Sequence, residues 1–457
     1  MRRAAPLTAF VLSVLSLVPA ARADDWPQWL GPKRDGVWRE PGLLDAIPKD
    51  GLKAAWRVPV GMGYAGPAVA QGKVFLMDRV LKQGAANPKD PFKQDKQGIP
   101  GSERVLCFDE PTGKPLWTFE YDCPYTVSYA GGPRVTPAVD GDRVYTYGTE
   151  GHLHCLDAAT GKLLWGRRLS QLPTQVWGYA CHPLVDGDLV YVTVVDPNGI
   201  LYALNKKTGE LVWQAIPAKE IGYSTPVIRE VSGRRQLLLW HPAGVTSVDP
   251  ATGKQLWHVA TEPMQYGVTA VTPVVHRDAK LGDVLFATSQ YGGALLVKLD
   301  KDAAGNPTGS LLWKRVAKGR KSDAIQTLIA TPVLRDGHVY GVDAYGQLRC
   351  LDLATGDRLW ESMEVTTYDQ PPVSWASTFL TPLGDAGGRT LFANEHGDLL
   401  LGDLSPKGLT VLGKTHLLDP TNTDARRPVL WVHPAYANKR IYWRNDKELA
   451  CFPFAKE

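Results

Sequence analysis

The sequence of 457 residues has almost no net charge and few cysteines, and several catalytic motifs are absent from it. Lys and Arg together number 51 against 47 Asp and Glu, and there are six Cys. No C-x-x-C-H haem-attachment sequence, G-x-S-x-G elbow or H-E-x-x-H zinc helix occurs. A nearly neutral chain gives no reason to expect nucleic acid as a partner. The motifs therefore identify no catalytic residue and no metal ligand.

Long hydrophobic runs are also rare, and the run at the N-terminus is short. The first three residues are basic, residues 7–18 are apolar, and Ala21–Ala23 offers a small-residue cleavage site. The apolar run is shorter than the roughly 20 residues that span a bilayer, and no Cys near the cleavage point would allow acylation. We expect residues 1–23 to be a signal peptide cleaved near Ala23. The mature protein is then periplasmic or secreted, and is not inserted in a membrane.

What the sequence does contain is a recurring pattern that is typical of a β-hairpin. Residues 155–165 read CLDAATGKLLW. Asp157 can bond the backbone two residues on, Thr160 and Gly161 form a tight turn in which Gly161 supplies a positive φ, and Trp165 ends the second strand. Apolar runs on both sides of the turn predict strands. Related stretches end in Trp117, Trp213, Trp257 and Trp360.

Each hairpin belongs to a longer unit that opens on a Pro. Eight such Pro residues occur from Pro67 to Pro434, and repeats of about 40 to 70 residues with four strands each are typical of propeller blades. The last unit has three strands, and a lone strand at Trp56 precedes the first unit. We predict an all-β fold for residues 52–457, an eight-bladed β-propeller of four-stranded antiparallel blades. The N-terminal strand would complete the last blade and close the ring. Residues 24–51 form an N-terminal extension, and we expect a monomer.

The repeated Leu-Asp-x-x-Thr-Gly-x-x-x-Trp hairpin resembles the tryptophan-docking motif of the β-propellers with pyrroloquinoline-quinone-like (PQQ-like) repeats. That family includes quinoprotein alcohol dehydrogenases and the BamB-type outer-membrane assembly lipoproteins. The resemblance covers residues 52–454. It implies that the motif is structural and that each Trp packs between neighbouring blades. Residues 26–36, WPQWLGPKRDG, also look like the opening of exported members whose function is undefined.

Aromatic residues occur in nearly every segment that leads into a blade. On the predicted fold these segments, with the loops after the second strand of each blade, lie on one face, which we call the loop face. Aromatic rings around the channel mouth suit a small planar or sugar-like ligand, or a peptide; alternatively, they plug the channel. The ligand-binding residues that we predict, with two polar residues from loops, are Tyr64, Tyr129, Trp177, Tyr179, Tyr223, Tyr266, Trp375, Glu395, His396 and Trp431.

Other features of the loop face are less specific. Glu150, Gln290 and Asp343 belong to a set of polar loop residues that could together hold a ligand or cation, although we interpret each of them as a solvated loop tip. Residues 79–104 are almost free of apolar side chains, so we predict a mobile loop with an open role as a lid or docking segment. Cys123 and Cys181 lie outside the position that the other four Cys share. Export would permit a disulfide between them, but the sequence does not place them within bonding distance.

The resemblance leaves two main functions open. Quinoprotein dehydrogenases of this family hold PQQ over a calcium ion, commonly against a disulfide of adjacent cysteines, with an Asp as base. No Cys-Cys pair occurs here, and no calcium-binding set can be assigned residue by residue. We predict a non-catalytic, BamB-like scaffold without a cofactor, which presents its loop face and channel mouth to a protein, peptide or glycan. The alternative is a divergent PQQ- and calcium-dependent alcohol or sugar dehydrogenase, and a hydrolase or lyase acting at the channel mouth is a third reading.

Overall fold

The structure is a computed structural model that describes residues 24–262, 264–316, 322–368, 370–384, 387–424 and 427–456, except for the side chain of Gln265. The expected signal peptide lies outside the described residues. Within those residues, no helix has the length and apolar character that a membrane crossing requires.

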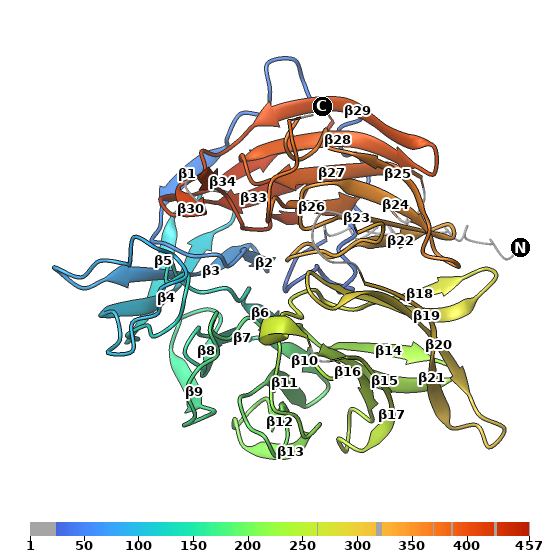
Figure 1. The fold of residues 1–457 in the computed structure, drawn as a ribbon. Coiled ribbons are helices and arrows are strands. Elements are labelled where there is room, and N and C mark those ends of the chain that lie inside the picture. The colour runs from blue at the N-terminus through green and yellow to red at the C-terminus, as the bar shows by residue number, and fades with distance from the viewer. Residues whose placement is uncertain are drawn as a thin grey trace, which may run out of the picture.

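Eight four-stranded antiparallel sheets are arranged as blades around a central axis (Figure 1), which confirms the predicted fold. Within the described residues, a two-stranded hairpin and one 3-10 turn, η1 (Gln265–Gly267), lie outside the blades. Blade 1 contains β2 (Ala68–Ala70), β3 (Lys73–Leu81), β4 (Gly101–Asp109) and β5 (Pro115–Asp122); blade 2 contains β6 (Ala138–Asp140), β7 (Arg143–Tyr147), β8 (His152–Asp157) and β9 (Leu163–Arg168); blade 3 contains β10 (Leu184–Asp186), β11 (Leu189–Thr193), β12 (Leu201–Asn205) and β13 (Leu211–Ala215). Blade 4 contains β14 (Val227–Val231), β15 (Arg234–His241), β16 (Gly244–Val248) and β17 (Gln255–Ala260); blade 5 contains β18 (Val274–Asp278), β19 (Gly282–Ser289), β20 (Gly293–Lys301) and β21 (Pro307–Arg315); blade 6 contains β22 (Val333–Arg335), β23 (His338–Val342), β24 (Leu348–Asp352) and β25 (Arg358–Ser362). Blade 7 contains β26 (Thr378–Pro382), β27 (Arg389–Asn394), β28 (Asp398–Ser405) and β29 (Gly408–His416); the hairpin consists of β30 (Asn422–Asp424) and β31 (Arg427–Val429); and blade 8 joins β32 (Ala435–Ala437), β33 (Arg440–Arg444) and β34 (Glu448–Pro453) to β1 (Trp56–Pro59) from the start of the propeller.

The turn between the last two strands of a blade is formed as its sequence predicts. Asp157 Oδ1 accepts hydrogen bonds from the Thr160 amide (2.8 Å) and hydroxyl (2.7 Å), and Gly161 has φ +73°. Trp165, at the end of the hairpin, donates from Nε1 to the Lys206 carbonyl of the next blade, at 3.0 Å. Its ring lies on Gly209, where a Cβ would come within 2.5 Å of the indole. The same Trp-on-Gly contact joins other pairs of neighbouring blades through Trp117, Trp213, Trp257 and Trp313, and Trp360 donates to Ser405 of the following blade.

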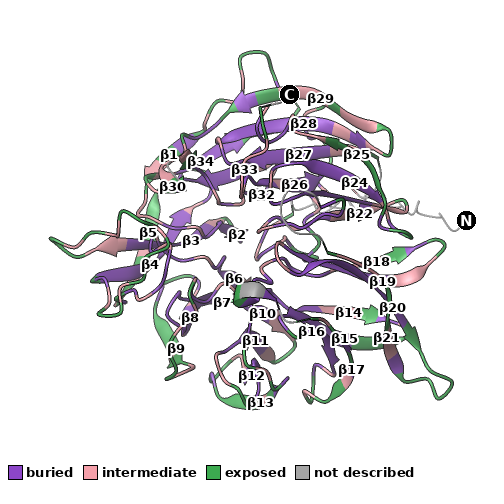
Figure 2. Ribbon diagram, in the orientation of Figure 1, coloured by how far each residue is buried: buried purple, intermediate pink, exposed green. Residues whose placement is uncertain are grey.

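The ring is closed by β1, the first strand of the propeller, as predicted. β1 pairs antiparallel with β34, with Trp56 opposite Cys451 and Pro59 opposite Glu448. Trp56 donates from Nε1 to the Glu110 carbonyl of blade 1 at 3.0 Å. The joint between blades 8 and 1 is therefore built like the joints between other blades. Figure 2 shows that the strands are mostly buried near the axis and more exposed at the outside of the ring.

The segment 79–104 differs from the mobile loop that we predicted. Its two ends belong to β3 and β4, and Arg79 and Glu103 are completely buried. Arg79 donates to the carbonyls of Ile99 and Ala130, both at 2.8 Å. The prediction of a mobile loop is wrong for these ends because buried charges can order a polar segment when each charge finds partners inside the fold.

The N-terminal extension is part of the propeller rather than an appended tail. Trp26 pairs through its backbone with Val69 of β2, and the carbonyl of Pro27 accepts from Val139 of blade 2 (2.8 Å). Arg34 donates to the carbonyl of Pro183, which leads into blade 3, at 2.6 Å, and burial lowers its pKa to about 9. The extension therefore runs across the end of the channel opposite the loop face. It also buries the indoles of Trp26, Trp29 and Trp38.

Candidate functional site

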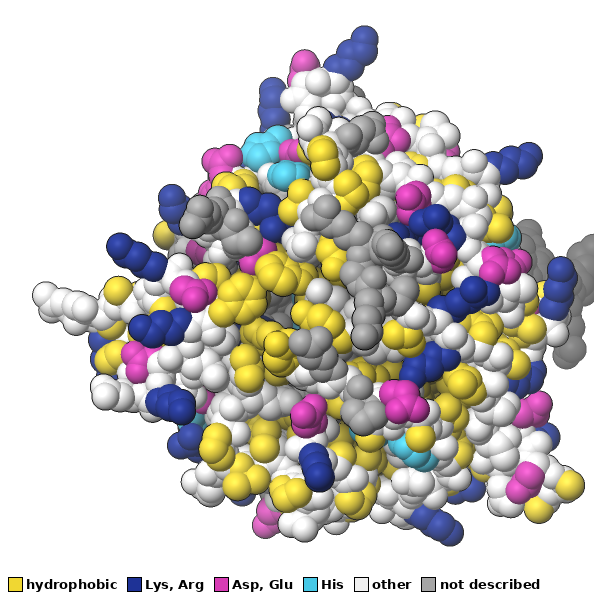
Figure 3. All heavy atoms as spheres, in the orientation of Figure 1, with side chains coloured by type: hydrophobic (Ala, Val, Ile, Leu, Met, Phe, Trp, Pro, Cys, Tyr) yellow, Lys and Arg dark blue, Asp and Glu magenta, His cyan; other side chains and the backbone are white. Residues whose placement is uncertain are grey.

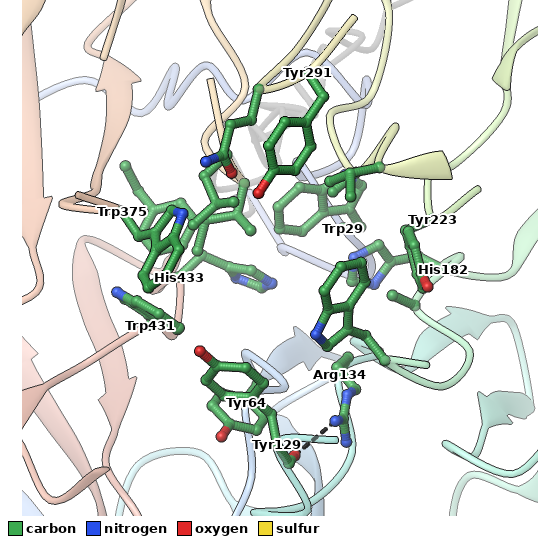
Figure 4. A pocket seen from close by; sticks show the side chains of 18 of the residues that line it. Trp29, Tyr64, Tyr129, Arg134, His182, Tyr223, Tyr291, Trp375, Trp431 and His433 are labelled. Atoms are coloured by element: carbon green, nitrogen blue, oxygen red, sulfur yellow. Dashed lines mark hydrogen bonds between the residues drawn. The ribbon is translucent and has the colours of Figure 1, made fainter. Parts of the chain in front are cut away.

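A pocket of about 230 Å³ opens at the centre of the loop face. Figure 3 shows hydrophobic side chains gathered around this hollow, and Figure 4 shows the rings that surround it. The ten aromatic lining residues are Trp29, Tyr64, Phe92, Tyr129, Trp177, Tyr223, Tyr291, Trp375, Phe379 and Trp431; the others are Arg134, Ala180, His182, Val268, Ala270, Gln290, Leu328, Ile329 and His433.

The structure brings together six of the ten residues that we predicted as ligand-binding. These six come from the segments that lead into six of the blades, and the pocket-lining residues among our predictions are Tyr64, Tyr129, Trp177, Tyr223, Trp375 and Trp431. As ligand-binding residues they stay predictions. The other four lie outside the pocket wall. Tyr179 is buried against Tyr147, and Tyr266 is 61% exposed and touches the edges of Trp177 and Tyr291.

Glu395 and His396 lie outside the pocket lining, and Glu395 supports a ring that lines it. The carboxylate of Glu395 accepts from Trp431 Nε1 at 3.0 Å and is paired with Arg427 at 3.1 Å. Arg427 also pairs with Asp424, which accepts from the Tyr129 hydroxyl at 2.8 Å. This chain of alternating charges fixes two pocket rings from outside. Burial and the bond to Asp424 raise the pKa of Tyr129.

Polar residues of other loops are buried as well, and bond to neighbouring loops rather than to pocket rings. Glu150 accepts from the Thr126 amide at 2.6 Å, and Asp343 accepts from the Gln326 amide at 3.0 Å and pairs with Arg349 at 3.1 Å. Glu150 and Asp343 are buried, so our interpretation of them as solvated tips is wrong. Both carboxylates accept hydrogen bonds from backbone amides of adjacent loops. These bonds satisfy the buried carboxylates and the amides together, as buried polar groups require. Gln290 does line the pocket.

Three aromatic residues at the pocket and its rim have left-handed backbones. The φ angles are +52° at Tyr129, +66° at Trp375 and +58° at Tyr266. Bulky residues rarely adopt this region, and such outliers often cluster at ligand sites. The Trp375 amide donates to the Ala344 carbonyl, and the Tyr129 amide to that of Pro91, both at 2.6 Å. These bonds hold the strained rings in place.

Trp29 of the N-terminal extension closes the pocket at its inner end. Its indole stacks on His182 (centroids 4.3 Å apart, planes 6° apart) and lies 4.3 Å from His433, and it donates to the Thr272 hydroxyl at 2.9 Å. Thr136 bonds both imidazoles: its amide donates to His182 Nδ1 at 2.8 Å, and its hydroxyl lies 2.9 Å from His433 Nε2. Burial lowers the pKa of His433 to about 3 and that of His182 well below its usual value. Both rings are therefore neutral at neutral pH.

Several lining residues were missing from the sequence prediction. His182 and His433 occupy the position before a blade-opening Pro where Thr is usual, so the substitution itself was a signal. Phe92 lies in the polar insertion, 45% exposed, with its ring 5.1 Å from Tyr129 and 5.6 Å from Trp375. Trp29 lies outside the repeats and gave no periodic signal.

The pocket carries little charge. Arg134 is the charged lining residue, and its guanidinium donates to the carbonyls of Ser128 (2.9 Å), Tyr129 (2.6 Å) and Gly132. Within the described ranges, no carboxylate forms an ion pair with it, and the pocket lining contains no Asp, Glu, Lys or Asn. Calcium requires six to eight oxygen ligands, commonly with carboxylates, so this lining does not fit the calcium ion of a quinoprotein site. None of the described Asp, Glu, His and Cys side chains forms a group of three that could hold a metal.

The cysteines do not contribute to the pocket either. All six are buried and none forms a disulfide, so Cys123 and Cys181 are not joined in this structure. Cys123 lies 3.8 Å from His152 Nδ1, and burial raises its pKa. A thiol in that state is a weak nucleophile.

Comparisons with known proteins agree with this architecture. A family described as outer membrane protein assembly factor BamB matches residues 101–362 and 282–422. The outer membrane protein assembly factor BamB of Yersinia pestis is 26% identical over 313 residues, which cover 64% of this chain and 74% of that protein. The crystal structure of BamB from Moraxella catarrhalis (TM-score 0.55, 15% identity) covers 88% of this chain and 100% of its own. The quinohemoprotein alcohol dehydrogenase of Comamonas testosteroni (TM-score 0.61, 15% identity) covers 96% and 82%. At 15% identity, these two structures show the fold alone.

Proposed function

Because the chain belongs to the family described as outer membrane protein assembly factor BamB, we propose that it is a non-catalytic scaffold that binds a protein partner on its loop face. In this reading the partner is a protein of the outer membrane or of its assembly machinery, and the scaffold works in the periplasm or outside the cell. The observation that carries the proposal is the lining of the pocket. Its aromatic rings are well fixed, but the described lining offers no carboxylate or lysine for proton transfer.

The loop face also has exposed apolar residues at the rim of the pocket and beyond it. Phe92, Leu172, Val176 and Tyr266 are 45%, 48%, 42% and 61% exposed. Three of them lie around the mouth: the Val176 carbonyl accepts from Ser128, next to Tyr129, and Phe92 and Tyr266 touch rings of the pocket lining. Exposed apolar groups around a concave mouth are typical of macromolecular docking surfaces.

The dehydrogenase alternative finds less support. A quinone could stack on these rings, but the lining does not fit the calcium ion, and the two buried imidazoles are held neutral. We expect no saturable binding when purified protein is titrated with PQQ and calcium, followed by absorbance and calorimetry. Binding near one equivalent together with dye-linked oxidation of an alcohol would replace the scaffold with the dehydrogenase.

The scaffold is tested by site-specific photo-crosslinking in cells. A photoreactive amino acid is placed at Val176 or Tyr266 on the loop face, and at Leu211 on β13 as a control, which is 49% exposed on the outside of blade 3. We expect cross-links to an outer-membrane or assembly protein, identified by mass spectrometry, from positions 176 and 266 only. Equal labelling from position 211, or none from the loop face, would contradict the proposal.

A further inference from the structure

We propose that the aromatic pocket binds one sugar ring at the free end of a glycan chain. The inference rests on the proposed function in one respect, namely that the site binds its ligand without reacting with it. It names the class of ligand for the pocket, whereas the protein partner occupies the surrounding loop face.

The shape of the pocket suits a ring-sized group that enters from one side. Trp29 closes the inner end, and a separate cavity of about 30 Å³ lies beyond it. The volume of about 230 Å³ is below the ~300–1,000 Å³ that is usual for drug-sized ligands. The pocket thus has room for one ring at a chain end, and the rest of the chain would leave past the exposed Phe92 and Tyr266.

The walls provide flat surfaces on several sides. In Figure 4, Trp375 and Trp431 face the pocket from one side and Tyr223 from the opposite side, and the Tyr291 hydroxyl points into the space between the rings. The C–H groups on the faces of a pyranose carry partial positive charge, and the faces of aromatic rings are negative. A pyranose can therefore stack on these walls without needing any charge of its own.

Polar groups on the walls separate a sugar from an apolar ligand. The indole N–H groups of Trp177 and Trp375 and the hydroxyl of Tyr291 have no hydrogen-bond partner among the described residues, although all three residues line the pocket. An apolar side chain of a peptide would strip water from these groups and leave them unpaired, at about 1–3 kcal/mol each. Sugar hydroxyls both accept and donate, so they can satisfy all three.

The charge of the pocket argues against a cation, which aromatic cages otherwise bind well. Arg134 lies in the wall over the Tyr64 ring, with its guanidinium carbon 5.3 Å from the centroid. No described carboxylate pairs with it, so its positive charge would repel an ammonium group. Its terminal N–H groups are already bonded to backbone carbonyls, so it is not set up to clamp an anion in a bidentate fashion. A neutral, hydroxyl-rich ligand is favoured.

The test is calorimetry of the full mature protein against methyl pyranosides and short oligosaccharides, with choline chloride and an aromatic dipeptide as competing classes. We expect 1:1 binding of at least one sugar. Trp375→Ala should weaken that binding at least tenfold, and Trp375→Phe, which keeps a ring but loses the N–H, by a smaller factor. Tyr291→Phe, which removes one oxygen, should weaken it about threefold while leaving the melting temperature unchanged. Leu211→Ala on β13 is the control, with unchanged affinity.

Absence of sugar binding by well-folded protein, or sugar binding that is unchanged in both Trp375→Ala and Tyr291→Phe, would overturn the inference. Binding of choline or of the dipeptide in place of sugars would do the same. The proposed scaffold would survive those results, because cross-linking from positions 176 and 266 does not require an occupied pocket.

Discussion

His182 and His433 are two imidazoles at the inner end of the pocket, the first buried and the second half-buried. Trp29 covers both rings, and Thr136 bonds to each of them. No described carboxylate is paired with either ring. Each imidazole is thus stable in the folded protein only while it is neutral, which makes it sensitive to acid.

We predict that the protein loses stability below pH 6.5, partly through His433. Its pKa is about 3 in the folded protein and ~6.5 when unfolded, so the unfolded chain takes up the proton first as the pH falls. The stabilisation is complete above pH 6.5 and is lost as the pH falls toward 3. Between pH 6.5 and 5 the loss from His433 is at most about 2 kcal/mol, because its ring is half-buried and partly screened by water. When the free energy of unfolding is measured with urea at several pH values, it should fall less steeply with decreasing pH for His433→Gln than for wild type.

The control for this prediction is His338→Gln. His338 lies at a turn, where its ring contacts the Asp336 carbonyl, and we expect the wild-type slope to remain. If wild type and His433→Gln lose the same free energy between pH 6.5 and 5, the acid sensitivity does not come from His433.

At the scale of the element, the hairpin that ends in Trp does two jobs. It closes its own blade, and its indole lies on the turn Gly of the next blade, as Trp165 does on Gly209. Position 209 requires glycine for two reasons. Its φ of +71° disfavours other residues, and the Trp165 ring occupies the space that a Cβ would need. Each joint is therefore specified locally, within about one repeat of sequence.

We predict that Trp56 is as important as the internal tryptophans, although it precedes all complete repeats. Trp56→Ala should lower the free energy of unfolding by about 3–5 kcal/mol, because it removes a buried indole and its bond to Glu110. Trp165→Ala should have a similar effect, and Leu164→Ala, at a position 41% exposed, should change stability by less than ~0.5 kcal/mol. Urea denaturation measures all three. A cost for Trp56→Ala close to that of Leu164→Ala would show that the joint between blades 8 and 1 is not held by this ring.

The elements that sequence could predict are those that repeat. The turn residues, the Trp and the opening Pro recur in register, so the number of blades and the closing strand followed from the pattern. The N-terminal extension has no such period: the partner of Trp29 is Thr272, 243 positions away. In the same way, Arg79 and Glu103 look like solvated charges until the fold supplies Ile99, Ala130 and Tyr125 as partners.

The candidate site was predictable to the same extent. Tyr64, Tyr223 and Trp431 sit at equivalent positions before a blade, and the ring geometry brings them together. Tyr179, two residues after Trp177, was predicted by the same reasoning but is turned away from the pocket and buried. Residue type and spacing do not show which of two nearby aromatics faces the channel.

On the scale of the whole molecule, the eight blades form a ring without a terminal repeat. Linear repeat proteins have end repeats with one neighbour, whereas here β1 gives blade 8 a joint with blade 1. The N-terminal extension adds hydrogen bonds to several blades around the channel. Its partners there include Val69, Val139 and Thr272. Weakening one joint should therefore lower the stability of the whole ring rather than of one blade.

We predict that Trp165→Ala, which weakens the joint between blades 2 and 3, leaves unfolding in a single step. Tryptophan fluorescence and far-ultraviolet circular dichroism should give coincident urea curves, shifted to lower urea. Two separated transitions would mean that groups of blades unfold on their own. Leu164→Ala serves again as the unshifted reference.

The pairing of β1 with β34 also constrains the order in which the blades can form. Trp56 is among the first residues of the propeller to leave the ribosome, and its partner Cys451 is among the last. Blades 1 to 7 can form as the chain emerges, because each is built from neighbouring sequence, but the final sheet has to wait for both termini. A contact across almost the full length of a chain is slow to form. Until β1 and β34 pair, blade 8 keeps an unpaired strand edge, to which a chaperone, a protease or a second copy of the chain can bind.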